Sequence, residues 1–436
     1  MRFTAAAALF LAASALAGPA FAQAQPEEGH AVIHAGTVLD RPGREPRRNA
    51  SIIVRAGKIL SIQDGFAEAP AGARVIDLRD RFVLPGLIDS HVHLVSDAGG
   101  ESGLVEEVRS SEGTAALRAA WNGSKTLMAG FTTVRNLGDG TGATLALRDA
   151  IAEGWVPGPR IVDAGDSIST TAGHMDSLSG IGERFHAGLS DQNLCDGPES
   201  CRQAVRRQIR RKADVIKIAT TGGVNSGTGR ARMAFDDEVK ALIDTAHMYG
   251  RKVAVHAHGA SGVNAALAAG ADSIEHGTEM DDETLRLFKR SGAYYVPTLS
   301  TVNGYIERLN ANPNAYAPKV LEQIKWRIGI TGQSLRKVVP AGVKIAFGTD
   351  AGVSKHGKNA DEFELMVKHG MTPASAIQAA TVNAADLLGL ATEVGTLEAG
   401  KAADIIAVSG NPLQDVAVLK RVGFVMKDGR VWKNER

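Results

Sequence analysis

The sequence of 436 residues has little net charge, few aromatic residues and only two cysteines. Lys and Arg number 49 against 48 Asp and Glu, with the two signs interspersed, so there is no electrostatic case for binding nucleic acid or an anionic membrane surface. Aromatic residues make up 5%, whereas 49 glycines are scattered along the chain, which suits many tight strand–helix connections. A chain of this length can bury a large core and still form a second, small domain.

The two cysteines, Cys195 and Cys201, are close in sequence, and no CxxC or Cys/His zinc pattern surrounds them. In an oxidising compartment we expect them to form a local disulfide, and two unpaired thiols are the alternative.

Several familiar catalytic motifs are also missing. The sequence contains neither a GxSxG elbow nor HExxH, which gives no support to a serine-hydrolase or zincin mechanism. The glycine-rich stretch 222–229 lacks the Lys-Ser/Thr ending of a phosphate-binding loop.

Residues 1–22 are typical of a secretory signal peptide. A short apolar stretch, 5–17, follows a basic start, and Ala20-Phe21-Ala22 forms a small-x-small cleavage site. The apolar stretch is too short to span a membrane. We therefore expect a mature chain that begins near Gln23, in the periplasm or outside the cell and without a membrane anchor, with residues 23–30 as a linker.

The two ends of the mature chain show the same sequence pattern. Residues 31–83 and 392–436 consist of short segments rich in β-formers, with a turn at Ala56-Gly57 in the first. Because a different pattern separates them, we expect both ends to build one small β-sandwich domain.

The middle of the chain, residues 84–391, alternates strands with helices. One helix is expected to begin with Asp236 as its N-cap and to stop at Gly250. The expected strands are residues 87–93, 132–135, 160–162, 215–218, 252–256, 273–276, 294–296 and 343–347. Eight strands alternating with helices over this length favour an α/β fold of the (β/α)8 TIM-barrel type over an open, doubly wound sheet.

Polar side chains with metal-ligating or basic chemistry follow several of these strands. His91 and His93 leave the same face of an extended backbone, which makes half of a metal site. The other members are Lys217, His256 with His258, His276 and Asp350. Taken singly, each has a structural explanation as a helix cap or a core residue. Taken together at the carboxyl ends of the strands, they predict one active site.

Lys217 is the unusual member of this set. Because neighbouring metal cations repel an ammonium group, its pKa should fall and the neutral amine should prevail. A neutral amine can add carbon dioxide to form a carbamate, whose two oxygens can bridge two cations. The alternative is an ion pair inside the barrel.

The combined pattern resembles the amidohydrolase superfamily in its binuclear form with a carboxylated lysine. The resemblance covers nearly the whole mature chain, from Val83–His93 at the entry to Gly395–Asp404 at the return. Four further segments resemble the branch that holds Xaa-Pro dipeptidases, imidazolonepropionase-related amidases and ochratoxinase: residues 215–218, 221–224, 256–259 and 274–277.

The resemblance implies a ligand set for two divalent cations, with zinc as the expected metal. His91, His93 and Asp350 would hold one, His256 and His276 the other, and Lys217 as N6-carboxylysine would bridge them together with a hydroxide. Two dications about 3.5–4 Å apart lower the pKa of a bridging water and polarise a substrate carbonyl.

Roles also follow for the remaining polar residues. Asp350 would accept the proton of the attacking hydroxide and pass it to the leaving amine, and His258 would stabilise the carbonyl oxygen. His174 and, more weakly, Ser96 are candidate substrate contacts. Arg230 and Arg232 are candidate partners for a substrate carboxylate.

We therefore expect a hydrolase that cleaves the amide bond of a small molecule, which would be a dipeptide, an N-acyl amino acid or an ochratoxin-like amide. One alternative is a cyclic amidase of the imidazolonepropionase type or a deaminase, and another is an inactive relative with a binding role. Lys217 argues against a mononuclear deaminase, and the presence of all six ligands argues against an inactive relative. The resemblance also implies a homo-oligomer.

Overall fold

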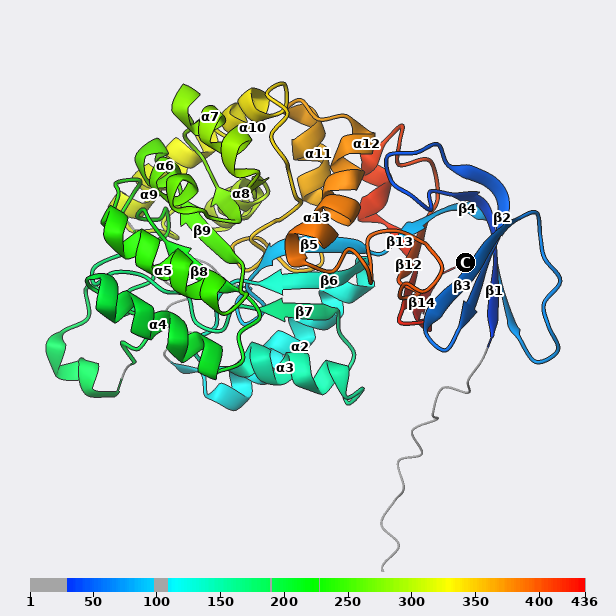
Figure 1. Cartoon of the computed structure of the whole chain (residues 1–436), viewed down its shortest axis with the longest axis horizontal. Coiled ribbons are helices and arrows are strands. Elements are labelled where there is room, and N and C mark those ends of the chain that lie inside the picture. Colours follow the sequence, from blue (N-terminus) through cyan, green and yellow to red (C-terminus); the bar gives the residue numbers. More distant parts are fainter. Residues whose placement is uncertain (1–29, 98–108, 189, 227, 436) are drawn as a thin grey trace, which may run out of the picture.

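The computed structural model describes residues 30–97, 109–188, 190–226 and 228–435. The expected signal peptide at 1–22 and the linker residues 23–29 lie outside the described residues. Figure 1 shows a sheet built from both ends of the chain beside a larger region of strands and helices.

Both ends of the chain contribute strands to one seven-stranded sheet, in the order β14-β13-β12-β4-β1-β2-β3. The strands are β1 (Ala31–Val38), β2 (Arg47–Arg55), β3 (Lys58–Asp64), β4 (Arg74–Pro85), β12 (Ile405–Val408), β13 (Val422–Lys427) and β14 (Arg430–Asn434). The expected turn between β2 and β3 is present, because Ala56 and Gly57 have φ values of 48° and 76°, as a two-residue hairpin requires.

This sheet encloses a core to which both chain ends contribute. Ile33 and Ile52 near the N-terminus share one apolar cluster with Ile405 and Phe424 near the C-terminus. Fully burying each of these side chains stabilises the fold by roughly 1.5–3 kcal/mol. The two ends of the chain are therefore held together by one apolar core.

Seven parallel strands form the centre of the larger region, in two sheets ordered β5-β6-β7 and β11-β10-β9-β8. They are β5 (Leu87–Val92), β6 (Phe131–Asn136), β7 (Arg160–Asp163), β8 (Ile216–Ala219), β9 (Val253–Ala257), β10 (Ser273–His276) and β11 (Tyr294–Val296). Most of their residues are buried, as near-continuous apolar runs in a covered parallel sheet predict.

Backbone hydrogen bonds connect the two sheets at both of their edges. Between β7 and β8, the N–H of Ile168 donates to the carbonyl of Lys217 at 2.9 Å. At the other edge, Tyr295 donates to the carbonyl of Lys344 at 2.8 Å, and Ser90 on β5 donates to that of Phe347 at 2.9 Å. Residues 344–347 thus lie between β11 and β5, where the eighth strand was expected, with the hydrogen bonds of a short bridge rather than of a regular strand.

Helices follow the strands and lie around them (Figure 1). They are α2 (Glu112–Met128), α3 (Ala143–Ala152), α4 (Pro198–Arg210), α5 (Asp236–Met248), α6 (Ala260–Ala269), α7 (Asp282–Ser291), α8 (Thr301–Ala311), α9 (Pro318–Gly329), α10 (Gln333–Val338), α11 (Asp361–Lys368), α12 (Pro373–Gln378) and α13 (Ala384–Leu388). Shorter helical turns are η1 (Glu183–Gly188), η2 (Ala379–Asn383) and η3 (Val416–Lys420).

The predicted start of α5 is wrong by one residue. Asp236 is the first helical residue rather than the N-cap, which is Phe235. The backbone N–H of Phe235 donates to Glu238 at 2.8 Å, so the glutamate satisfies the helix start and no polar N-cap side chain is needed.

The expected disulfide between Cys195 and Cys201 is present. Cys195 donates its backbone N–H to the carbonyl of Ser169 at 2.9 Å, which ties the disulfide loop to the segment after β7. Across the described parts of the chain, no helix combines the length and the apolar character needed to cross a bilayer.

Candidate functional site

A cavity of about 190 Å³ lies at the carboxyl ends of the parallel strands. It is lined by all the site residues expected from the sequence except Ser96 and the two candidate arginines, Arg230 and Arg232. Its lining comprises His91, His93, His174, Met175, Lys217, Val224, Asn225, His256, His258, His276, Thr301, Tyr305, Arg327, Asp350 and Val353. The fold thus gathers side chains that are up to 262 positions apart in the sequence, from His91 to Val353.

Two histidines from the end of β5 meet Asp350. Oδ1 of Asp350 lies 3.4 Å from Nε2 of His91 and 3.2 Å from Nε2 of His93. The backbone fixes this approach, because Asp350 donates its N–H to the carbonyl of His91 at 2.7 Å and has a φ of 58°. Such a left-handed conformation is uncommon outside glycine and is found at sites where geometry is over-determined.

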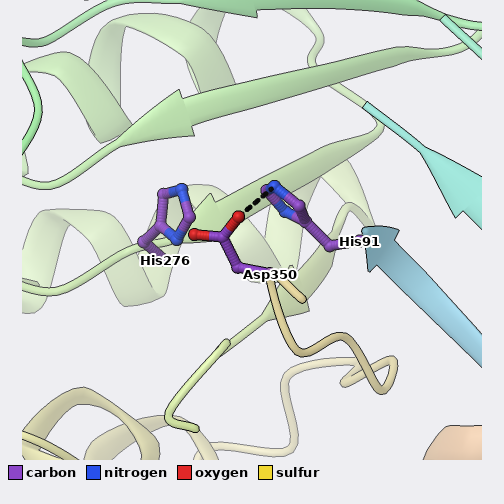
Figure 2. Close-up of side chains that lie close together, drawn as sticks. All are labelled: His91, His276 and Asp350. Atoms are coloured by element: carbon purple, nitrogen blue, oxygen red, sulfur yellow. Dashed lines mark ion pairs between the residues drawn. The ribbon is translucent and has the colours of Figure 1, made fainter. Parts of the chain in front are cut away.

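Ring nitrogens of His91 and His276 and a carboxylate oxygen of Asp350 all lie within 4.8 Å of one another. Figure 2 shows the three side chains pointing toward one another, with His91 beside the end of β5 and Asp350 on a loop. Two imidazole nitrogens and a carboxylate oxygen form a donor set that suits a divalent transition metal. The three side chains therefore form a candidate metal site.

Glu275 fixes the ring of His91 by contacting Nδ1, the nitrogen that does not face Asp350. Its Oε2 accepts from Nδ1 of His91 at 2.8 Å, so the proton lies on Nδ1 and the lone pair of Nε2 faces the cavity. Arg135 donates to the other carboxylate oxygen at 2.8 Å, and all three residues are almost completely buried. Burial alone would raise the pKa of Glu275, but Arg135 and His91 hold it at about 2.

The other histidines are held in the same way. Nδ1 of His276 lies 2.7 Å from Oγ1 of Thr298, and Nδ1 of His258 lies 2.7 Å from Oγ1 of Thr278. Nε2 of His256 donates to the carbonyl of Gly222 at 3.1 Å.

Each of these three imidazoles therefore uses one ring nitrogen for anchoring, and no hydrogen bond to a described residue occupies the other. Burial lowers the pKa of His256, His258 and His276 well below the usual value, so each ring is neutral. Neutral imidazole is the form that binds a metal ion.

Lys217 points its amine into this group of side chains. Its side chain is 1% exposed, and Nζ has no hydrogen-bond partner among the described residues. Burial lowers its pKa to about 8. Buried polar atoms in folded proteins are almost always satisfied, so an orphaned amine indicates a missing partner. An amine poised for deprotonation, beside imidazoles and a carboxylate, fits a carbamate that bridges two metal ions.

The candidate substrate contacts differ in their placement. His174 lines the cavity, with its ring 4.1 Å from that of His256 and its Nδ1 2.9 Å from Oγ of Ser226. Ser96 lies outside the lining, and its carbonyl accepts from Nε2 of His356 at 2.9 Å. The placement of Ser96 therefore gives no support to a role in substrate contact.

The two arginines proposed for a substrate carboxylate also lie outside the cavity lining. Arg230 pairs with Glu279 at 2.8 Å, and Arg232 pairs with Asp236 at 2.5 Å. A different arginine, Arg327, lines the cavity. Sequence reasoning missed it because it lies within a helix far from any strand end.

Comparisons with known proteins agree with this arrangement. The model of the Amidohydrolase family matches residues 82–432. The ochratoxinase of Aspergillus niger is 33% identical over 428 residues, covering 92% of this chain and 86% of its own. Imidazolonepropionase of Geobacillus kaustophilus is 25% identical over 433 residues, covering 88% of this chain and 92% of its own. A crystal structure of a Xaa-Pro dipeptidase with methionine bound in its active site is 40% identical, with a TM-score of 0.89, and the match covers 93% of this chain and 100% of that one.

Proposed function

Because the chain belongs to the amidohydrolase family, we propose that it is a metal-dependent hydrolase that cleaves the amide bond of a dipeptide or an N-acyl amino acid. The observation that carries the proposal is the buried amine of Lys217, which has no hydrogen-bond partner among the described residues and shares one cavity with six imidazoles and Asp350. This donor set fits two divalent cations held by a carbamate, and imidazole with oxygen ligands favours zinc.

The residues divide between two metal positions. His91, His93 and Asp350 would hold one cation, and His256 and His276 the other, with carboxylated Lys217 between them. When bound, the cations would lower the pKa of water and polarise the substrate carbonyl.

The protein side chains move protons and stabilise charge. Interactions with His91 and His93 outweigh burial and hold the pKa of Asp350 at about 2, so its carboxylate is ionised at neutral pH. It accepts a proton from the attacking water and delivers it to the amide nitrogen, which would otherwise leave as a poor anion. Nδ1 of His258 lies 2.7 Å from Oγ1 of Thr278. With the hydroxyl as the donor, Nε2 of His258 would carry the proton and donate it in a hydrogen bond to the carbonyl oxygen as negative charge develops there.

The size of the cavity favours a small substrate. At about 190 Å³ it lies below the range of roughly 300–1,000 Å³ that is usual for ligand pockets. A dipeptide or a short N-acyl amino acid matches this space better than an extended peptide. The relatives support the same class, because one is a Xaa-Pro dipeptidase and another an ochratoxinase.

Two alternatives make different predictions. A cyclic amidase of the imidazolonepropionase type would act on ring amides and not on linear ones. An inactive relative would lack a complete ligand set, whereas the cavity contains every ligand that the family resemblance implies.

Metal analysis combined with a substrate screen tests the proposal. We expect about two metal ions per chain and hydrolysis of linear Xaa-Pro dipeptides or N-acyl amino acids. Lys217→Ala should lose metal, and Asp350→Asn should lose activity. An Asp350→Asn variant with full activity, or hydrolysis of cyclic imides alone, would contradict it.

We also propose three features of the whole protein. The two linked sheets and residues 344–347 form one closed eight-stranded barrel over residues 84–391, and the seven-stranded sheet folds into a sandwich. Residues 1–22 direct secretion, with cleavage near Gln23, and the disulfide suits the oxidising compartment that this implies. The enzyme acts as a homo-oligomer. N-terminal sequencing and light scattering of the mature protein test the last two.

A further inference from the structure

Arg327 is a buried cation that has no counter-charge among the described residues. It lies on α9 with 3% of its surface exposed and lines the cavity. Its guanidinium donates to two neutral acceptors at 3.2 Å each, the carbonyl of Thr298 and Oγ1 of Thr331. Among the described residues it has no ion pair. Arg135, the other arginine that is almost fully buried in this region, pairs with Glu275.

Such a charge is costly unless something compensates it. Removing a guanidinium from water is unfavourable, and proteins retain buried charges mainly where these are paired or where a ligand completes the pair. Two of the five N–H donors of Arg327 are occupied, which leaves capacity for a bidentate acceptor such as a carboxylate. The cavity itself cannot supply one, because Asp350 is the single acidic side chain in its described lining and already contacts His91 and His93.

The position of Arg327 suits one part of an amide substrate. Trp326, its neighbour in sequence, places its ring edge against His258 with 5.9 Å between centroids. The guanidinium of Arg327 itself donates to the carbonyl of Thr298, whose Oγ1 contacts His276. The ring of His276 stacks on that of His258 with 5.0 Å between centroids, so Arg327 enters the cavity near the group that would stabilise the carbonyl oxygen. In an N-acyl amino acid, only the amide nitrogen and Cα separate the scissile carbonyl from the α-carboxylate. A cation that binds this carboxylate must consequently lie near the oxyanion donor, as Arg327 does.

We propose that Arg327 binds the free α-carboxylate of the amino acid that the reaction releases. The inference rests on the proposed amide hydrolysis and narrows its substrate class. It restricts good substrates to N-acyl amino acids and dipeptides with a free C-terminal carboxylate, and it disfavours their C-terminal amides and neutral ring amides. Arg327 thus takes the carboxylate-binding role that the sequence suggested for Arg230 and Arg232, whose charges are already paired outside the cavity.

The first experiment measures binding without turnover. L-Methionine and L-methioninamide are titrated into the metal-loaded wild type, Arg327→Gln and the matched control Arg230→Gln by calorimetry. We expect the wild type to bind the acid about 10²-fold more tightly than the amide, because the amide leaves the guanidinium unpaired. Arg327→Gln should lose most of this preference, and Arg230→Gln should keep it. An equal preference in wild type and Arg327→Gln would overturn the inference.

The second experiment compares hydrolysis of N-acetyl-L-methionine with that of N-acetyl-L-methioninamide. We expect Arg327→Gln to lower kcat/KM about 10²-fold for the acid, mainly through KM, and to change the amide little. A purely structural role, exerted through Thr298 and His276, would instead lower kcat and metal content for both compounds. Arg327→Lys, which keeps the charge, should retain part of the preference and serves if the glutamine variant does not fold.

The outcomes separate this inference from the proposed function. If the wild type hydrolyses acid and amide equally, the carboxylate site is refuted and amide hydrolysis stands. If it binds L-methionine in a manner that depends on Arg327 but hydrolyses no linear amide, the carboxylate site stands and the proposed function fails.

Discussion

Replacing Glu275 with glutamine tests whether the buried charges behind His91 support both folding and metal binding. The carboxylate accepts from Nδ1 of His91 and from Nη2 of Arg135, each at 2.8 Å, and from Oγ of Ser273 at 2.6 Å. The glutamine keeps the shape but removes the charge, so it leaves the guanidinium of Arg135 buried without a counter-ion.

The expected cost follows from the pKa of this carboxyl group. Although burial opposes it, the charge of Arg135 and the hydrogen bond from His91 lower the pKa of Glu275 from 4.5 to about 2. At 1.36 kcal/mol per pKa unit, this drop stabilises the folded protein by about 3 kcal/mol. Because the folded-state pKa is depressed, the contribution is complete above pH 4.5 and is lost as the pH falls toward 2. Breaking a buried pair costs roughly 3–5 kcal/mol, which agrees in magnitude.

Two measurements follow from this argument. Urea unfolding of metal-free protein at pH 7 should show Glu275→Gln less stable by about 3 kcal/mol, and the difference should shrink below pH 4.5. Chelator competition should show metal affinity about 10–100-fold lower, because His91 loses the partner that fixes its ring.

A double-mutant cycle with Arg135→Met provides the control. Removing both charges should cost less than the sum of the single changes, since no unpaired ion remains. A loss below about 1 kcal/mol in Glu275→Gln, with additive costs, would refute the reasoning.

Three further predictions concern Glu362, the disulfide and the choice of substrate. Burial raises the pKa of Glu362 to about 7, although the hydrogen bonds that it accepts from Leu299 and Ser300 oppose this shift. Its contribution to the free energy of unfolding should therefore fall by about 3 kcal/mol as the pH rises from 4.5 to 7. In urea unfolding, Glu362→Gln should abolish this pH-dependent loss of stability. Replacing both Cys195 and Cys201 with serine should lower the free energy of unfolding by about 2 kcal/mol, and reductant should then change the stability of the wild type but not of the variant. N-acetyl-L-proline should have a kcat/KM at least equal to that of glycyl-L-proline, because the described lining offers the dipeptide ammonium no carboxylate besides Asp350; a clear preference for the dipeptide would contradict this.

The strand ends could be predicted from the sequence because there an apolar run, which indicates a buried strand, stops at a polar side chain with metal-ligating chemistry. Apolar runs that stop at His91, Lys217, His256 or His276 signal both a covered strand and a polar group at its carboxyl end, and the structure brings these groups into one cavity. The segment before Asp350 was predicted as a strand for the same reason. Its residues form only short bridges, since tertiary hydrogen bonds rather than local propensity decide how long a strand continues.

The residues that support the candidate metal site were harder to foresee. Arg135 and Glu275 each lie inside a buried strand, and their sequence positions differ by 140. Periodicity reveals that a position is buried, but it does not identify the partner that makes a buried charge tolerable. The left-handed backbone of Asp350 is equally hard to foresee, because a tertiary hydrogen bond to the end of β5 holds it there and non-glycine residues adopt this conformation uncommonly.

The apolar periodicity of α9 could have identified Arg327 from the sequence. In α9, Leu321, Ile324 and Ile328 recur at helical spacing, and Arg327 lies three residues after the fully buried Ile324, on the same face. A charged residue at an apolar position of an amphipathic helix must either reach solvent or meet a counter-charge. Arg327 does not reach solvent, and the described protein provides no counter-charge, so the substrate carboxylate is the counter-ion that explains its burial. A buried charge without a partner on helix α9 therefore indicates a bound ligand, in the same way that the unpartnered amine of Lys217 on strand β8 does.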